Sequence, residues 1–176
     1  HQMADVNQFI FQQLSEGRQC YIVFPLIEES EKVDLMSLEE GYEQFKHAFP
    51  AHKVGMVHGK LKPEVKEEEM RKFASGETNI LVATTVIEVG VDVPNATVMV
   101  ITSAERFGLS QLHQLRGRVG RGGHQSYCIL VSGDSIGETS LQRIQIMCQS
   151  TDGFYLAEQD LKIRGHGDME GTRQSG

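Results

Sequence analysis

Five short apolar runs, none of which alternates between polar and apolar residues, most strongly limit what this chain can fold into. They are rich in β-branched residues and span residues 20–24, 53–57, 80–83, 98–101 and 127–131. Strands that are hydrophobic along their whole length are typical of parallel sheets, because such strands are buried on both faces. The chain is therefore predicted to form a parallel sheet with helices on both sides.

Helical segments separate these runs. They are predicted at residues 6–16, 38–49 and 63–74. Ser37 and Glu40 have the spacing of a capping box at the start of the second segment, and Pro63 stands in the first turn of the third. Because helices alternate with strands along the chain, the predicted fold class is α/β.

The pattern changes after the fifth apolar run. Helix-like stretches near residues 136–150 and 154–163 precede a glycine-rich end at residues 165–176, which by itself would indicate a flexible tail. We predict a division into a domain at residues 1–133 and a helical hairpin with a following loop at residues 134–176.

Composition limits the class of protein. A chain of 176 residues with 39% hydrophobic residues can bury one core and a small extension. The formal net charge of −7 excludes a surface that is basic all over, so any nucleic acid must be bound by local clusters of basic residues.

The three cysteines are far apart and form neither a disulfide framework nor a zinc motif, which indicates a reducing cytosol. No run approaches the roughly 20 apolar residues that span a bilayer, so no membrane is expected.

The stretch QLHQLRGRVGRG at residues 111–122 is the most informative for chemistry. Arg116, Arg118 and Arg121 stand among glycines with no acidic residue beside them. A guanidinium group donates two parallel hydrogen bonds to a phosphate and stays charged, and we expect the glycines to allow a tight turn. The alternative, a helix end with arginines facing solvent, is equally compatible with this stretch alone.

A second stretch, residues 80–96, continues a buried strand into polar residues. The strand is followed by Thr84 and Thr85 and then by Gly90 and Asp92. Ligands of open α/β sheets bind at the carboxyl ends of strands, where hydroxyls suit a phosphate backbone and a carboxylate suits sugar hydroxyls. An ordinary strand end, with threonines that cap the next helix, is the alternative.

Together, in this order and spacing, the two stretches resemble motifs V and VI of superfamily 2 helicases. Residues 21–25 resemble motif IV, and His58 with Gly59 resembles the motif after the second strand, although a lone histidine is more often a packed or capping residue. The resemblance implies a second RecA-like motor domain.

The C-terminal run, residues 152–176, resembles the coupling motif of RecG helicases and of the transcription-repair coupling factor Mfd. The ending GTRQSG favours the RecG type, although His166 stands where that family commonly has proline. The resemblance implies that this loop links ATP turnover to movement on DNA. The coupling residues would be Arg164, Gly167, Asp168, Thr172, Arg173 and Gln174.

The resemblance also implies a role for each candidate site residue. ATP with Mg²⁺ would lie between this domain and a first motor domain absent from this sequence, and Arg121 would be the arginine finger. Phosphate contacts are expected from Arg121, Arg118 and Gln114, ribose contacts from Gly90 and Asp92, and DNA contacts from Thr84, Thr85, His58 and Gly59.

The sequence lacks the glycine-rich GK[ST] loop and the acidic pair that bind ATP phosphates and Mg²⁺. We therefore expect this chain alone to hold no cofactor and to hydrolyse no ATP. The resemblance implies forked, four-way and duplex DNA as partners, a separate wedge domain in the same protein, and a bacterial cytoplasmic location.

Three alternatives stay open at this point. An Mfd-like translocase is the nearest. A nucleic-acid-binding module without catalysis is a second, although such a module would not need the arginines of residues 114–121. A dinucleotide-binding domain is a third, but it requires a GxGxxG after the first strand, and residues 25–31 contain no glycine.

Overall fold

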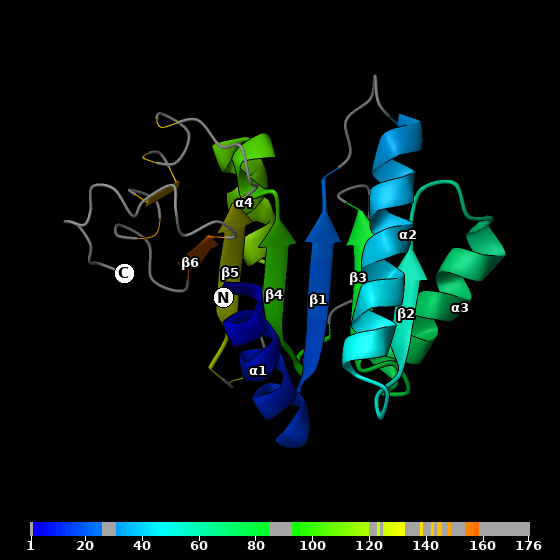
Figure 1. Ribbon diagram of the computed structural model, residues 1–176. Helices are drawn as coiled ribbons and strands as arrows, with labels where there is room; N and C mark the ends of the chain where they lie inside the picture. The colour runs from blue at the N-terminus through cyan, green and yellow to red at the C-terminus, as the bar shows by residue number, and fades with distance from the viewer. Residues whose placement is uncertain are drawn as a thin grey trace.

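The computed structural model describes residues 2–25, 31–84, 93–119, 123, 125–132 and 154–158, with single positions at 138, 142, 144, 145 and 148. Within these ranges the chain forms a six-stranded sheet in the order β2-β3-β1-β4-β5-β6, and every neighbouring pair is parallel (Figure 1). The strands are β1 (Gln19–Phe24), β2 (Val54–Val57), β3 (Ile80–Thr84), β4 (Ala96–Thr102), β5 (Tyr127–Ser132) and β6 (Phe154–Glu158).

Helices cover both faces of the sheet. α1 (Gln2–Ser15) and α2 (Glu31–Ala48) pack on one face, while α3 (Pro63–Ala74) and α4 (Leu109–Arg116) pack on the other. A short 3₁₀ helix, η2 (Ala104–Arg106), joins β4 to α4. The predicted α/β class with a parallel sheet is confirmed.

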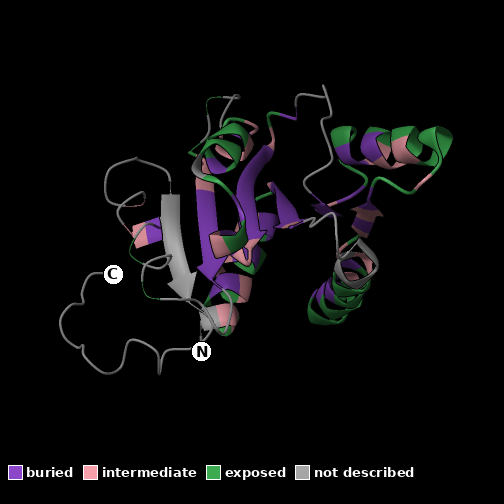
Figure 2. Cartoon of the chain, turned by 90° about the horizontal axis from the view of Figure 1, so that it is seen from above, coloured by how far each residue is buried: buried purple, intermediate pink, exposed green. Residues whose placement is uncertain are grey.

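Alternate residues of β1 to β5 enter separate cores on the two faces. In β1, Cys20 and Ile22 face α1 and α2, whereas Tyr21 and Val23 face α3 and α4. Strands β1, β3, β4 and β5 are almost wholly buried, and the described helices carry their exposed residues on the sides that face away from the sheet (Figure 2). Each fully buried aliphatic side chain contributes about 1.5–3 kcal/mol, so the two cores account for the uniform hydrophobicity of the strands.

A buried polar network joins the amino ends of the strands. The Nε2 of Gln19 donates to the carbonyls of Phe73 at 2.6 Å and Thr78 at 2.9 Å. Asn95 donates to the carbonyl of Gly17 at 2.7 Å, and Arg18 donates to the Oδ1 of Asn95 at 2.9 Å. These bonds fix the start of β1 to the ends of α1 and α3 and to the loop before β4.

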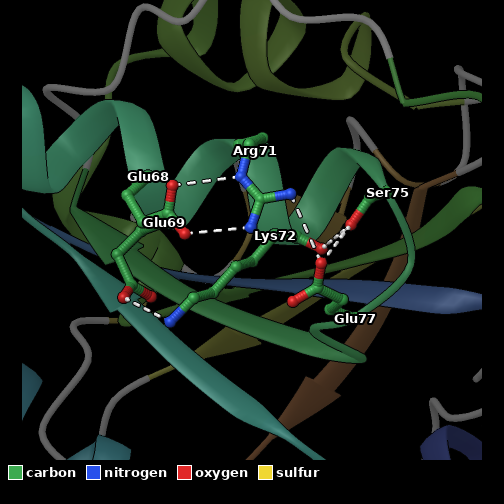
Figure 3. A network of polar contacts seen from close by, with 6 residues as sticks. All are labelled: Glu68, Glu69, Arg71, Lys72, Ser75 and Glu77. Atoms are coloured by element: carbon green, nitrogen blue, oxygen red, sulfur yellow. Dashed lines mark hydrogen bonds and ion pairs between the residues drawn. The ribbon is translucent and has the colours of Figure 1, made fainter.

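The outer surface of α3 carries a second, exposed network (Figure 3). Arg71 contacts Glu68 at 2.9 Å and Glu77 at 3.3 Å, and Lys72 lies 3.8 Å from Glu69. The hydrogen bond from Arg71 lowers the pKa of Glu68. Exposed pairs of this kind contribute little to stability.

Two predicted helix assignments are wrong. α2 begins at Glu31, so Ser37 lies inside the helix and is not its cap. The stretch from residue 154 is a strand and not a helix over residues 154–158, because β6 pairs with the edge of β5 in register from Cys128↔Phe154 to Ser132↔Glu158. Tertiary pairing here overrides the local pattern.

The described positions of the stretch 136–150 are helical, as predicted: Glu138, Gln142, Ile144, Gln145 and Cys148. No helix in the described ranges is long and apolar enough to cross a membrane.

Candidate functional site

The carboxyl ends of the parallel strands meet at one edge of the sheet, and several predicted site residues lie there. Thr84 ends β3 directly opposite Phe24, which ends β1. His58 follows β2, whose last residue, Val57, lies opposite Ala83 of β3. The fold therefore places His58, Thr84 and Phe24 side by side at the edge where ligands of open α/β sheets bind.

Thr84 has a polar group at this edge that is left unsatisfied by the described residues. Its side chain is 3% exposed, and Oγ1 has no hydrogen-bond partner among the residues that the structure describes. A buried hydroxyl without a partner costs about 1–3 kcal/mol. This cost is explained if a group from outside the described ranges bonds to Thr84.

His58 is held in one tautomer. Its Nδ1 accepts a hydrogen bond from the backbone N–H of Lys60 at 3.2 Å, and the residue is 8% exposed. Burial lowers the pKa of His58, Glu39 raises it and Lys66 lowers it further. The imidazole is therefore neutral near pH 7, with its proton on Nε2. Gly59 beside it is exposed.

α4 positions the arginine-rich stretch. Leu112 and Val119 are buried in the core on this face of the sheet, and Leu115 packs against the same core. Gln114, on the opposite side of the helix, is exposed. The N-terminus of α4 is fixed by the N–H of Gly108, which donates to the Oε1 of Gln111 at 2.9 Å.

The turn after α4 fixes the backbone of Arg118. Its N–H donates to the carbonyl of Leu115 at 2.9 Å, and the next N–H, of Val119, donates to the carbonyl of Arg116 at 3.3 Å. Gly117 has φ −69° and ψ −7°, a conformation open to any residue, so the turn does not require a glycine at this position, and Gly120 lies outside the described residues. The left-handed conformation lies further on, at Gly123 with φ 85°.

Several predicted site residues lie outside the described residues. They are Thr85, Gly90, Asp92 and Arg121 at the site, and Arg164, Gly167, Asp168, Thr172, Arg173 and Gln174 in the coupling segment.

The three cysteines pack in or against the hydrophobic cores. Burial raises the pKa of Cys128 to about 12, although the positive charge of Arg116 lowers it in part. Burial also raises the pKa of Cys148, to about 11. Burial also raises the pKa of Cys20 well above its usual range. Thiols this basic are protonated near pH 7 and unreactive. Among the described residues, no group of three His, Cys, Asp or Glu side chains could hold a metal ion.

Sequence reasoning missed the last residue of β4 and the residue that follows it. The Oγ1 of Thr102 donates to the carbonyl of Val23 at 3.0 Å, which ties the end of β4 to β1. Ser103 has a left-handed backbone, with φ 49° and ψ 50°. Neither Thr102 nor Ser103 belongs to a motif that could be recognised in the sequence.

Comparison with known proteins decides the family. The helicase conserved C-terminal domain family matches residues 1–123, and the C-terminal part of domain 3 of the ATP-dependent DNA helicase RecG matches residues 150–176. The chain belongs to the RecG-type helicase C-terminal domains. The predicted resemblance is confirmed.

Two bacterial RecG helicases illustrate the similarity of this RecG-type domain to known proteins. The ATP-dependent DNA helicase RecG of a Synechocystis species is 55% identical over 96% of this chain and 20% of the relative. RecG of Bacillus subtilis is 52% identical over 100% of this chain and 26% of the relative. The RecG-type domain thus spans between a fifth and about a quarter of these relatives.

Solved structures agree with the RecG-type assignment. A structure of RecG bound to a three-way DNA junction has a TM-score of 0.70 and 44% identity, and the match covers 96% of this chain and 22% of that one. Domain 2 of the DEAD-box helicase Mss116p, bound to an RNA duplex, has a TM-score of 0.66 at 18% identity, over 93% of this chain and 62% of that one. This second likeness shows the fold alone.

Proposed function

We propose that this chain is the second motor domain of a RecG-type ATP-dependent DNA helicase that remodels branched DNA, such as forks and four-way junctions, in the bacterial cytoplasm. The observation that carries the proposal is the identity of 52–55% to RecG helicases over nearly the whole chain. A first motor domain and a wedge domain of the same protein would complete the machine.

ATP with Mg²⁺ would lie against the turn after α4, where its hydrolysis supplies the free energy for movement. The turn suits a phosphate, because residues 111–122 contain no acidic side chain and the backbone of Arg118 is fixed by a hydrogen bond. Arg118 and Arg121 would stabilise the charge that develops on the γ-phosphate, with Arg121 as the finger. Gln114 would contact the same phosphate, and Gly90 and Asp92 the ribose.

The carboxyl edge of β2 and β3 would hold the DNA backbone. The hydroxyl of Thr84, which has no partner within the described ranges, and the Nε2 proton of His58 are donors suited to phosphate oxygens, and Thr85 and Gly59 would extend the same contact. Contacts to phosphates position a strand without reading its sequence, which suits a motor that must move along any DNA.

The coupling segment would transmit closure of the motor to the DNA. This role would fall to Arg164, Gly167, Asp168, Thr172, Arg173 and Gln174. The test is the complete helicase with Arg173→Ala, assayed for both ATP hydrolysis and remodelling of a four-way junction. The proposal expects hydrolysis to continue while remodelling is lost. A variant that remodels normally would refute the coupling role, and a complete protein that remodels no junction with ATP would refute the function.

A further inference from the structure

A cavity of about 290 Å³ opens between the α1–α2 layer and the carboxyl ends of β1 and β4. Asn7 of α1 and Gln44 of α2 line one side, and Thr102, Ser103 and Arg106 line the other. The chain leaves β1 through α2 on one face of the sheet and leaves β4 through α4 on the other face. The cavity therefore lies where the connections diverge, which is the place in open α/β sheets where ligands bind.

The charge of the cavity favours an anion. Arg106 is exposed at its wall, and no described residue forms an ion pair with it. No Asp or Glu belongs to the described lining, although the chain as a whole has a net charge of −7. An arginine without a competing carboxylate donates hydrogen bonds to a phosphate in a bidentate manner.

The remaining wall favours a flat group with hydrogen-bond donors. Phe24 and Phe45 contribute aromatic surface. The Oδ1 of Asn7 is buried and has no hydrogen-bond partner among the described residues, so a ligand N–H that donates to it would satisfy this acceptor. A base with an exocyclic amine presents such a donor on its edge, beside a face that packs on aromatic rings.

A strained backbone at Ser103 and a close contact between Phe24 and Gly41 fix the shape of this site. Ser103 is the one residue other than glycine, among those described, with a positive φ, and such strain concentrates at ligand sites. On the other side, the ring of Phe24 occupies the space in which a side chain at position 41 would stand, so with glycine at this position the ring lies directly against α2.

We infer that this cavity binds a single nucleotide, with its phosphate on Arg106 and its base between the phenylalanine rings and Asn7. The volume lies at the low end of ligand pockets, about 300–1,000 Å³, which suits one nucleotide and not a longer strand. The nucleotide is either a free mononucleotide or the terminal residue of a DNA strand, since both present the same chemistry. This inference goes beyond the proposed motor function and does not depend on ATP hydrolysis.

The test is a titration of the isotopically labelled full chain, followed by two-dimensional NMR. Deoxyadenosine monophosphate should shift the side-chain amide of Asn7 and the amides of Thr102 and Arg106, whereas inorganic phosphate and deoxyadenosine, tested separately, should each bind more weakly. A 5′-phosphorylated trinucleotide distinguishes the two sources: tighter binding than the mononucleotide points to a strand end, and weaker binding points to a free nucleotide. A weak site has a dissociation constant of ~1 mM. If deoxyadenosine monophosphate at concentrations up to about 10 mM shifts none of these signals, the inference is overturned.

Two variants and a matched control sharpen the test. Arg106→Gln should weaken binding about tenfold or more, the effect of one lost charge-assisted hydrogen bond. Lys72→Gln removes the same charge from α3, on the other face of the sheet, and should leave binding unchanged. Asn7→Leu should weaken binding without lowering the melting temperature, because it removes an unsatisfied buried acceptor. If both cavity variants bind as well as the unaltered chain, the nucleotide is held elsewhere and the inference is wrong. Because every readout is binding and not hydrolysis, failure here is distinguishable from failure of the motor function.

Discussion

Phe24 and Thr84 lie opposite each other in the ladder between β1 and β3, at the last position of both strands. This pairing brings two segments that are 60 residues apart in the chain to one edge of the sheet, and it places the buried hydroxyl of Thr84 there without a partner among the described residues. Thr84 is one of the candidate DNA contacts, and Phe24 lines the cavity proposed to bind a nucleotide, so the two sites adjoin at this pair of strand ends.

Thr84→Val should separate a functional role from a structural one. The substitution keeps the shape but removes an unsatisfied hydroxyl, so the free energy of unfolding should stay the same or rise by up to about 1–2 kcal/mol. In the complete helicase, DNA stimulation of ATP hydrolysis should nevertheless fall, which steady-state hydrolysis with and without DNA would measure.

Thr97 offers a matched control for this variant. Its Oγ1 is also buried and unpartnered within the described ranges, but it lies near the start of β4, at the opposite edge of the sheet. Thr97→Val should have the same effect on stability and none on DNA stimulation. Equal loss of stimulation in both variants would contradict the role of Thr84.

His58 should make stability depend on pH in a known direction. Because burial lowers the pKa of His58 below its ordinary value of 6.5, the unfolded chain binds the proton more readily than the folded chain. The free energy of unfolding should therefore fall as pH drops below about 6.5, and the contribution of His58 should level off below its folded pKa. Denaturant melts between about pH 7.5 and pH 5, with His58→Gln as reference, measure this contribution as the difference between the two curves. Parallel curves would show that His58 titrates normally.

Gln19→Ala should lower stability much more than a change in the exposed network of α3. Removal of the Gln19 amide takes a donor from the carbonyl of Thr78 and leaves the carbonyl of Phe73 with the N–H of Gly76 at 3.2 Å, at an expected cost of about 1–3 kcal/mol in unfolding free energy. Arg71→Ala, by contrast, breaks ion pairs that water already screens and should leave the melting midpoint nearly unchanged. Equal midpoints for the two variants would contradict this account of the amino edge.

The sequence predicts those parts of the fold that depend on local pattern. The five apolar runs became β1 to β5, and α3 has the predicted bounds, because Pro63 sets the start of that helix. β6 was missed because residues 154–158 become a strand only through pairing with β5, far away in the chain. The early start of α2 was missed because the capping pattern at Ser37 outweighed the helical residues before it.

The candidate site was partly predictable, because some of its residues belong to local sequence motifs. Thr84, His58 and Arg118 belong to motifs that a reader can recognise, and the structure adds how each is held. The cavity at Arg106 depends on Asn7, from the first helix, meeting the end of β4, and no motif records that meeting. Contacts between distant segments are set by the fold and not by spacing in the sequence.

ATP hydrolysis by the complete helicase with Arg121→Ala tests the central claim most directly. The account predicts that DNA-stimulated hydrolysis falls by about 10³- to 10⁵-fold while ATP binding is retained, because an arginine finger acts on charge that develops in the transition state. Arg116→Ala is the matched control, since Arg116 is the arginine of the stretch 111–122 to which no phosphate contact is assigned, and this variant should retain most activity. Hydrolysis by Arg121→Ala within about tenfold of the unaltered enzyme would contradict the claim. The finger would then be Arg118, or this domain would supply none.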